Sequence, residues 1–162
     1  MHDMNIRLKY FSRILFTCAI LFSFFNSMCA QQGNISDRVE KISNQQLFGY
    51  CQQIWVVDLA SPSADSLVSD LSDMPILLRT EVIKRAIFPF LDDSSRGIAM
   101  HYVLCRATKK PTSFGSNVPS NDTAVIKLSY SGLNFYQSRG RYFAATPELL
   151  ANKEEWRKYF SR

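Results

Sequence analysis

Apolar positions in the first half of the chain recur mainly at helical spacing. After a polar stretch at 31–36, which we expect to be a flexible lead, they return every three or four residues and predict a helix over 37–53. The continuous apolar run at 54–57 fits either an extension of that helix or a short buried strand. A short acidic amphipathic helix is expected after a cap at Ser61, and the strongest apolar stripe predicts a helix over 76–91.

The second half of the chain changes to alternating periodicity. Residues 98–105 predict a strand that is apolar on both faces, and a long loop follows at 108–122. Three further strands with tight turns between them are expected after this loop, at 124–130, 133–136 and 141–145. Pro147 in a first turn then predicts a final helix that continues to the C-terminus.

This order of elements predicts the α+β class. Helices come first, an antiparallel meander follows and one helix closes the chain, so the two kinds of element are segregated along the sequence. We expect the N-terminal helices to pack on one face of a curved antiparallel sheet, with the C-terminal helix beside them. At this chain length, residues 37–162 are expected to form a single domain.

The first 30 residues have the layout of a secretory signal peptide. A basic segment with Arg7, Lys9 and Arg13 precedes an uncharged apolar run at 14–25, and small and polar residues follow. The run is shorter than the roughly 20 apolar residues that a bilayer span needs. An uncleaved anchor or a buried helix is the alternative. We expect cleavage near residue 30, so that the mature chain begins near Gln31.

Removal of this segment changes the charge balance. The full chain has 19 Lys and Arg against 14 Asp and Glu, a net charge of +5. The signal segment contains three of these bases and one acid, so the mature chain has 16 against 13, or +3. Such a balance does not indicate a nucleic-acid-binding protein, which usually has a dense basic stripe.

Two cysteines remain in the mature chain. In an oxidising compartment we expect Cys51 and Cys105 to form a disulfide, with two separate buried thiols as the alternative. A lipid anchor at Cys29 is disfavoured, because the residues before it make a poor acylation signal. Asn34 and Asn121 each begin a glycosylation sequon, which matters only for a eukaryotic source.

The mature chain has few residues for catalysis or metal binding. Its single histidine, His101, shares a predicted strand with Cys105, where residues four apart lie about 13 Å from one another, too far for a nucleophile and its base. One histidine and two cysteines do not complete a four-ligand zinc site, and no G-x-S-x-G or phosphate-binding loop is present. We therefore expect a core histidine, no metal and no cofactor.

Two surfaces are candidates for binding. The long loop, if it folds toward the turn at 138–141, makes a basic and partly aromatic patch of Lys109, Lys110, Phe114, Arg139 and Arg141. A solvated loop tip is the alternative. The last helix has three aromatic residues that either dock on the domain itself or anchor a partner: Trp156, Tyr159 and Phe160.

These features favour a small exported, non-enzymatic protein that binds another protein or an envelope component, as an accessory subunit of a surface or secreted assembly. We expect it in the periplasm, at the cell surface or outside the cell, with no nucleic-acid partner and no membrane span after signal cleavage. The alternatives are a carrier of a small apolar ligand in a pocket between helices and bent sheet, and, less favoured, a small secreted hydrolase that uses His101.

Overall fold

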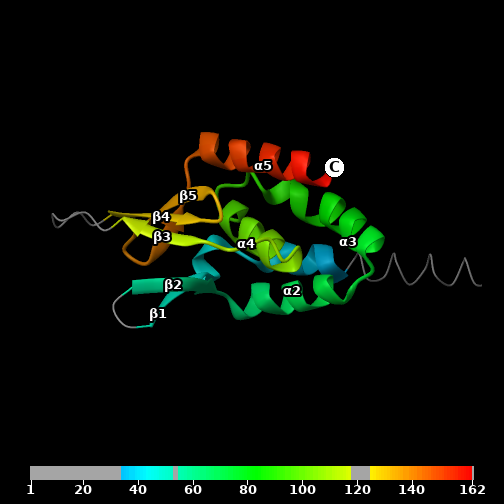
Figure 1. The fold of residues 1–162 in the computed structure, drawn as a ribbon, viewed down its shortest axis with the longest axis horizontal. Coiled ribbons are helices and arrows are strands. Elements are labelled where there is room, and N and C mark those ends of the chain that lie inside the picture. The colour runs from blue at the N-terminus through cyan, green and yellow to red at the C-terminus, as the bar shows by residue number, and fades with distance from the viewer. Residues whose placement is uncertain (1–33, 53–54, 118–124, 162) are drawn as a thin grey trace, which may run out of the picture. The chain divides into compact units, whose positions relative to one another are not determined.

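The computed structural model describes residues 34–52, 55–117 and 125–161, and Ile35–Arg162 form one compact unit (Figure 1). The predicted signal peptide, its cleavage site and Cys29 lie outside the described residues, as does Asn121. No helix in the part of the chain that the structure describes is long and apolar enough to cross a membrane.

The α+β class is confirmed. The N-terminal half contains a helical segment at 34–41, the 3-10 turn η1 (Asn44–Gln46), strands β1 (Phe48–Gln52) and β2 (Trp55–Ala60), and helices α2 (Pro62–Asp73) and α3 (Ile76–Val82). The C-terminal half contains α4 (Gly97–Ala107), β3 (Phe114–Asn117), β4 (Val125–Tyr130), β5 (Leu133–Ser138), β6 (Arg141–Phe143) and α5 (Thr146–Phe160).

The strands form two antiparallel sheets. β1 pairs with β2, and the larger sheet is a four-stranded meander in the order β3-β4-β5-β6. This sheet is not strongly curved, unlike the bent sheet that we expected. Because neighbours along a strand point to opposite faces, one face is buried against the helices and contains Leu128, Tyr130, Leu133, Phe135 and Tyr142.

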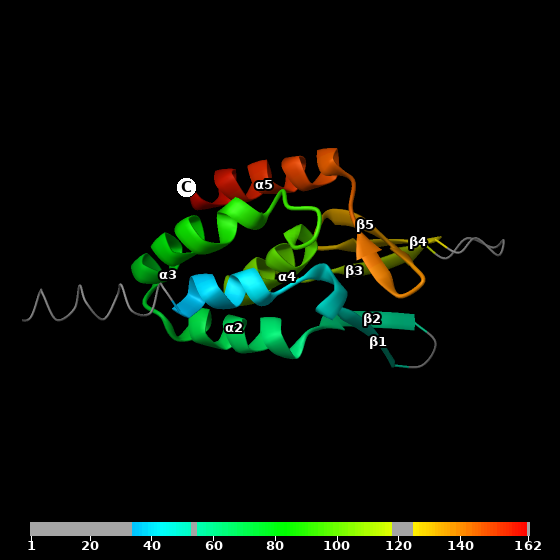
Figure 2. The same ribbon diagram turned by 180° about the vertical axis from the view of Figure 1, so that it is seen from behind.

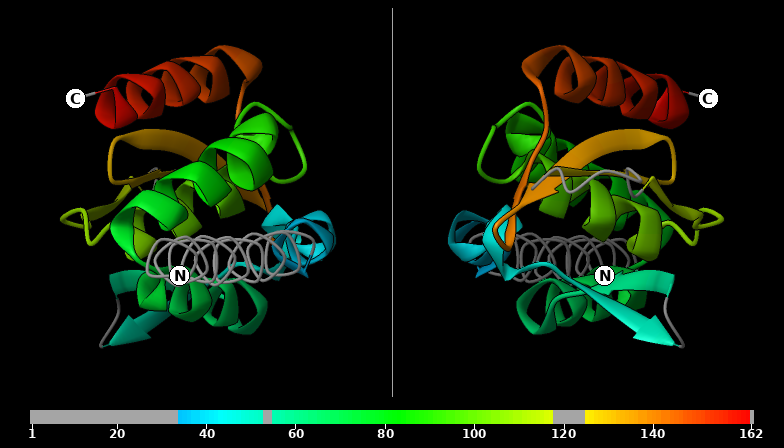
Figure 3. Two further views of the ribbon diagram at one scale, coloured as in Figure 1. Left: turned by 90° about the vertical axis from the view of Figure 1, so that its right-hand side faces the viewer. Right: turned by 90° about the vertical axis from the view of Figure 1, so that its left-hand side faces the viewer.

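Helix α4 lies in the middle of the domain. Two perpendicular views place it between α5 on one side and α2 on the other, with the β1–β2 hairpin on the same side as α2 (Figures 1 and 3). Seen from behind, the helical segment 34–41 runs beside α2 (Figure 2), where Arg38 donates to Asp70 and to Ser66. Ten of the eleven α4 residues are buried, all except Arg106.

The expectation of a strand at 98–105 was wrong, because these residues belong to α4. A run that is apolar on every side fits a helix surrounded by other elements as well as it fits a central strand, and periodicity does not distinguish the two. Helix α4 begins at Gly97, where an added Cβ would lie 2.7 Å from the Leu91 carbonyl oxygen and 2.8 Å from a Leu149 methyl group. Only a residue without a side chain fits this close approach.

The N-terminal expectations also need correction. The helix predicted over 37–53 ends at residue 41, and β1 occupies its second half. Residues 55–57 of the ambiguous run belong to a strand, β2, and residue 54 lies outside the described part. Residues 34–36 of the expected flexible lead are helical, and Ile35 is buried. The apolar positions after residue 41 continued the helical spacing by coincidence, since they belong to a turn and a strand.

Most of the remaining elements follow the sequence pattern. Helix α2 begins with a Ser61 cap, whose hydroxyl accepts a hydrogen bond from the Ala64 amide, as expected. The helix predicted over 76–91 starts as α3, widens into a π-helical segment at Ile83–Ile87 and then tightens into a 3-10 turn at Phe88–Phe90. Helix α5 begins at Thr146 with Pro147 in its first turn.

Candidate functional site

His101 is at the centre of a buried polar cluster that joins three elements. Its side chain, on α4, is 1% exposed. The indole Nε1–H of Trp156, on α5, donates to Nδ1 of the ring at 2.9 Å. Nε2 lies 2.9 Å from the backbone carbonyl oxygen of Tyr130, at the end of β4. The imidazole therefore ties the central helix to the sheet and to the last helix.

The hydrogen bonds determine the tautomer of this ring. An indole nitrogen can only donate, so Nδ1 of His101 accepts and has no proton. The ring proton is therefore on Nε2 and is donated to the Tyr130 carbonyl. Burial is the main cause that lowers the pKa of His101 from 6.5 to about 4; the bond to the Tyr130 carbonyl opposes it and the positive charge of Lys110 adds to it. The ring is therefore neutral near pH 7.

Cys105 lies one helical turn after His101, and its Sγ is 3.5 Å from Nε2. The helix thus brings together two side chains that a strand would have kept apart. Cys105 is a free, fully buried thiol in the structure, so the predicted Cys51–Cys105 disulfide is not formed there; the side chain of Cys51 is outside the described part. Burial raises the pKa of the Cys105 thiol to about 11.

This pair is not arranged as a nucleophile and base. Nε2 of His101 already holds a proton, so it cannot accept one from the Cys105 thiol, and both groups are neutral near pH 7. The hydrolase hypothesis requires His101 at a cleft, whereas the ring is sealed in the core. The cluster is therefore best explained as a structural bond between elements.

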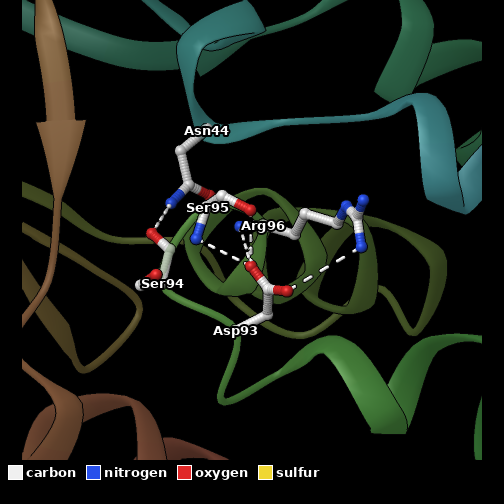
Figure 4. Close-up of polar contacts among 5 residues, drawn as sticks. All are labelled: Asn44, Asp93, Ser94, Ser95 and Arg96. Carbon is white, nitrogen blue, oxygen red and sulfur yellow. Dashed lines mark hydrogen bonds and ion pairs between the residues drawn. The ribbon is translucent and has the colours of Figure 1, made fainter.

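A second polar cluster holds the start of α4 (Figure 4). The buried side chain of Asn44 donates from Nδ2 to the Ser94 carbonyl at 2.9 Å, and its Oδ1 accepts from the Ala99 amide at 3.0 Å. Asp93 accepts from the amide and hydroxyl of Ser95 and from the Arg96 amide. Asn44 and Asp93 thus satisfy amides at and just before the helix start, where no intrahelical partner exists.

These bonds also act on the charge of Asp93. Burial alone would raise the pKa of this carboxyl, but the hydrogen bonds from Ser95 outweigh it, with help from Arg96, so the pKa lies below its usual value. Asp93 stays ionised near neutral pH as a helix-capping group. The bonds of this second cluster position the start of α4.

Helix α5 is fastened to the domain at several points. Besides the Trp156–His101 bond, the Phe160 ring packs edge-on against Phe88 at 5.7 Å, and Lys153 pairs with Asp92 at 2.8 Å. The hydrogen bond from Lys153 lowers the pKa of Asp92. Of the three aromatic residues expected either to dock or to anchor a partner, Trp156 is buried, Phe160 is half-buried and Tyr159 is 43% exposed. The docked alternative applies to the first two.

The structure separates the residues of the predicted basic patch into two groups. Lys109 and Lys110 follow α4, and Phe114 pairs with Tyr130 at the β4–β5 end of the meander. Arg139 and Arg141 are at the β5–β6 turn, which adjoins the other end of β4. The two ends of β4 are about 17 Å apart. Phe114–Asn117 of the predicted loop form β3 and pair with β4, which holds Phe114 at the end of β4 away from Arg139 and Arg141. Residues 118–122 of that loop lie outside the described part.

The face of the four-stranded sheet that points away from the helices is exposed. Lys127 of β4 lies opposite Tyr136 of β5, which lies opposite Phe143 of β6, so the three form one row across the sheet. The rings of Tyr136 and Phe143 stack at 5.6 Å, and Phe143 is 43% exposed. We call this the open face; Val125, Ser138 and Arg141 form its next row. The alternation along β4 and β5 could have revealed these residues.

A groove lies where α5 meets the β4–β5 turn. It has a volume of about 300 Å³, and we call it the α5 groove. It is lined by Lys110, by Ser131, Gly132, Leu133 and Asn134 of the turn, and by Glu148, Ala151, Asn152, Glu155 and Trp156 of α5. Sequence reasoning singled out two of these residues, Lys110 and Trp156, but placed them in separate sites. The spacing of the α5 residues on one helix face is the signal that was overlooked.

Among the described residues, no three His, Cys, Asp or Glu side chains are grouped so that they could hold a metal ion. Comparison of the chain with protein-family models, with curated proteins and with solved structures finds no match.

Proposed function

We propose that this chain is a small exported, non-enzymatic protein that binds an acidic partner protein through the open face. The observation that carries the proposal is the composition of that face. Its row of Lys127, Tyr136 and Phe143 places a cation beside two stacked aromatic rings, and Arg141 lies in the next row. Aromatic residues and arginine are the side chains that contribute most to protein interfaces.

The charge of this region supports an acidic partner. Strand β3 and residues 125–145 contain three cations, Lys127, Arg139 and Arg141, and no Asp or Glu. A surface of one sign steers and selects partners of the opposite sign. Export is proposed from the basic and apolar pattern of the first 30 residues.

The alternative of an apolar-ligand carrier has less support. A groove does lie between a helix and the sheet, where such a pocket was expected, but Lys110, Glu148 and Glu155 are among its lining residues. Apolar ligands favour pockets with mainly hydrophobic walls.

The proposal is tested by placing a photo-crosslinking amino acid at position 143 of the full-length chain in the cells that produce it. We expect one acidic protein to be crosslinked in a fixed ratio. Arg141→Glu, combined with Lys127→Glu, should abolish the product, whereas Lys158→Glu on the exposed side of α5 should leave it unchanged. Equal crosslinking in both variants, or none at position 143, would contradict the proposal. Sequencing the N-terminus of the exported chain should find a start near Gln31.

A further inference from the structure

We propose that the α5 groove is a binding site for a small zwitterion with one carboxylate and one ammonium group, such as a free amino acid or a dipeptide. This site is distinct from the open face and does not depend on the function proposed above. The groove has donors for a carboxylate near Trp156 and carboxylates for an ammonium group along α5. The ligand follows from the groups that lack a partner and from the charges around them.

The first of these groups is the amide of Asn152. The side chain is 9% exposed, and its Nδ2 has no hydrogen-bond acceptor within the described part of the protein. A buried donor without an acceptor is costly and calls for an explanation. Since Asn152 forms part of the wall of the groove, an oxygen atom of a bound ligand would supply the missing acceptor.

The second group is the ammonium of Lys110. Its Nζ lies 4.9 Å from the centre of the Trp156 ring, and no described carboxylate pairs with it. The end of α4 fixes this position, because Lys109 adopts a left-handed φ of 54° and the Lys110 amide donates to the Cys105 carbonyl at 3.0 Å. A cation over a ring, beside an unpaired amide donor, suits a carboxylate better than a neutral carbonyl.

The carboxylates of the groove determine the second charge of the ligand. Glu148 accepts from the Ala145 amide with one oxygen, and Glu155 pairs with Lys158 at 3.0 Å through one oxygen. Each residue also lines the groove. Two carboxylates against one lysine disfavour a simple anion such as phosphate, whereas a ligand that also carries an ammonium group matches both signs.

The size of the groove agrees with this class of ligand. Its lining residues on α5 run from Glu148 to Trp156, two helical turns or about 12 Å. A volume of about 300 Å³ is at the lower end of small-molecule sites and accommodates one or two amino-acid residues.

The test uses the full-length chain with Trp55→Phe, so that Trp156 is the only tryptophan, and follows its fluorescence during titration with L-alanyl-L-alanine. We expect saturable binding that weakens at least tenfold for acetyl-alanyl-alanine, which lacks the ammonium, and for alanyl-alanine amide, which lacks the carboxylate. Lys110→Gln should weaken binding of the free dipeptide at least tenfold, whereas Lys109→Gln, the exposed neighbour, should not. Glu155→Gln should weaken the free dipeptide but not the acetylated one.

Several results would overturn the proposal. The first is a Trp156 fluorescence that shows no saturable change up to about 10 mM dipeptide. The others are equal affinity for free and capped dipeptides, and equal effects of Lys110→Gln and Lys109→Gln on binding. Lys110 is a half-buried surface residue, so its variant is expected to fold even if changes at Asn152 do not. Binding at the open face is measured by crosslinking at position 143, so the two proposals succeed or fail separately.

Discussion

The indole of Trp156 and the imidazole of His101 are 55 residues apart in sequence, yet they share a buried hydrogen bond of 2.9 Å. The bond assigns the ring proton of His101 to Nε2 and thereby also directs the contact with the sheet. Burial keeps this histidine, the single one among the described residues, neutral near pH 7. Because the bond joins α5 to α4, the docking of α5 can be followed through the titration of His101 on α4.

Removal of the indole donor should destabilise the domain. Trp156→Phe leaves Nδ1 of His101 buried without a donor, so we expect the free energy of unfolding to fall by about 2 kcal/mol or more. Urea unfolding measures the change. Tyr159→Phe, on the exposed side of the same helix, is the control and should change it by less than about 0.5 kcal/mol.

The stability of the domain should depend on pH through His101. Its pKa is about 4 in the folded state against 6.5 ordinarily, so between these values the unfolded chain binds an additional proton. The contribution of this ring is complete above about pH 6.5 and declines as the pH falls toward 4, by about 3 kcal/mol in total.

Urea unfolding between pH 7 and pH 4.5 measures this decline. Asp92 and Asp93 have lowered pKa values and lose their contributions only in more acidic solution, so they do not account for it. His101→Gln should remove most of the slope between pH 6.5 and 4.5. If the free energy of unfolding of the wild-type protein is as insensitive to pH in this range as that of His101→Gln, His101 is not a buried neutral histidine.

Cys105 should be chemically protected in the folded protein. Its thiol is buried and its pKa is raised to about 11, so little reactive thiolate exists at pH 7. Alkylation followed by trypsin digestion isolates the fragment 97–106, which contains this cysteine alone. We expect slow labelling of this fragment in buffer and rapid labelling in urea. Absence of labelling in urea without a reductant would instead indicate the disulfide with Cys51.

The close packing around Gly97 predicts a steric penalty. An alanine Cβ would meet the Leu91 backbone oxygen at 2.7 Å, and the backbone cannot move aside easily. We expect Gly97→Ala to lower the free energy of unfolding by about 1–3 kcal/mol. Gly115→Ala is the matched control, because its nearest neighbour, the Ser129 Cβ, is 3.9 Å away. Similar losses in both variants would contradict the packing argument.

Asn44 should be intolerant of change for a different reason. Its amide satisfies both the buried Ala99 amide and the part-buried Ser94 carbonyl, so Asn44→Ala leaves both groups without this partner. We expect a loss of about 2–4 kcal/mol in thermal or urea unfolding. Gln46→Ala, which removes only exposed local bonds, should cost much less.

The sequence was most informative where a local signal was sufficient. The Ser61 cap, the turns at Ser131–Gly132 and Arg139–Gly140, and Pro147 each depend on neighbouring residues alone, and the elements that they delimit occur as expected. The α+β class followed from the same signals. The curvature of the sheet did not, because it depends on how strands twist against their neighbours.

The error at α4 had the largest consequences. Burial on all sides removes the polar face by which a helix is recognised, so the residues resemble a central strand. A strand would also have kept His101 and Cys105 about 13 Å apart. In the helix, Sγ of Cys105 lies 3.5 Å from Nε2 of His101. The candidate sites were misjudged similarly, since Lys110, Asn152 and the turn at Ser131 meet only through tertiary structure.

The position of Trp156, 55 residues after His101, also affects how the protein folds. Helix α5 follows α4 and all four strands of the larger sheet, so a nascent chain that has reached β6 contains α4 and the sheet but no donor for Nδ1 of His101. Contacts between distant parts of a chain form slowly because a long loop must close first. Docking of α5 is therefore expected to follow formation of the sheet, which leaves α4 and the sheet without one of their packing partners until α5 has been made.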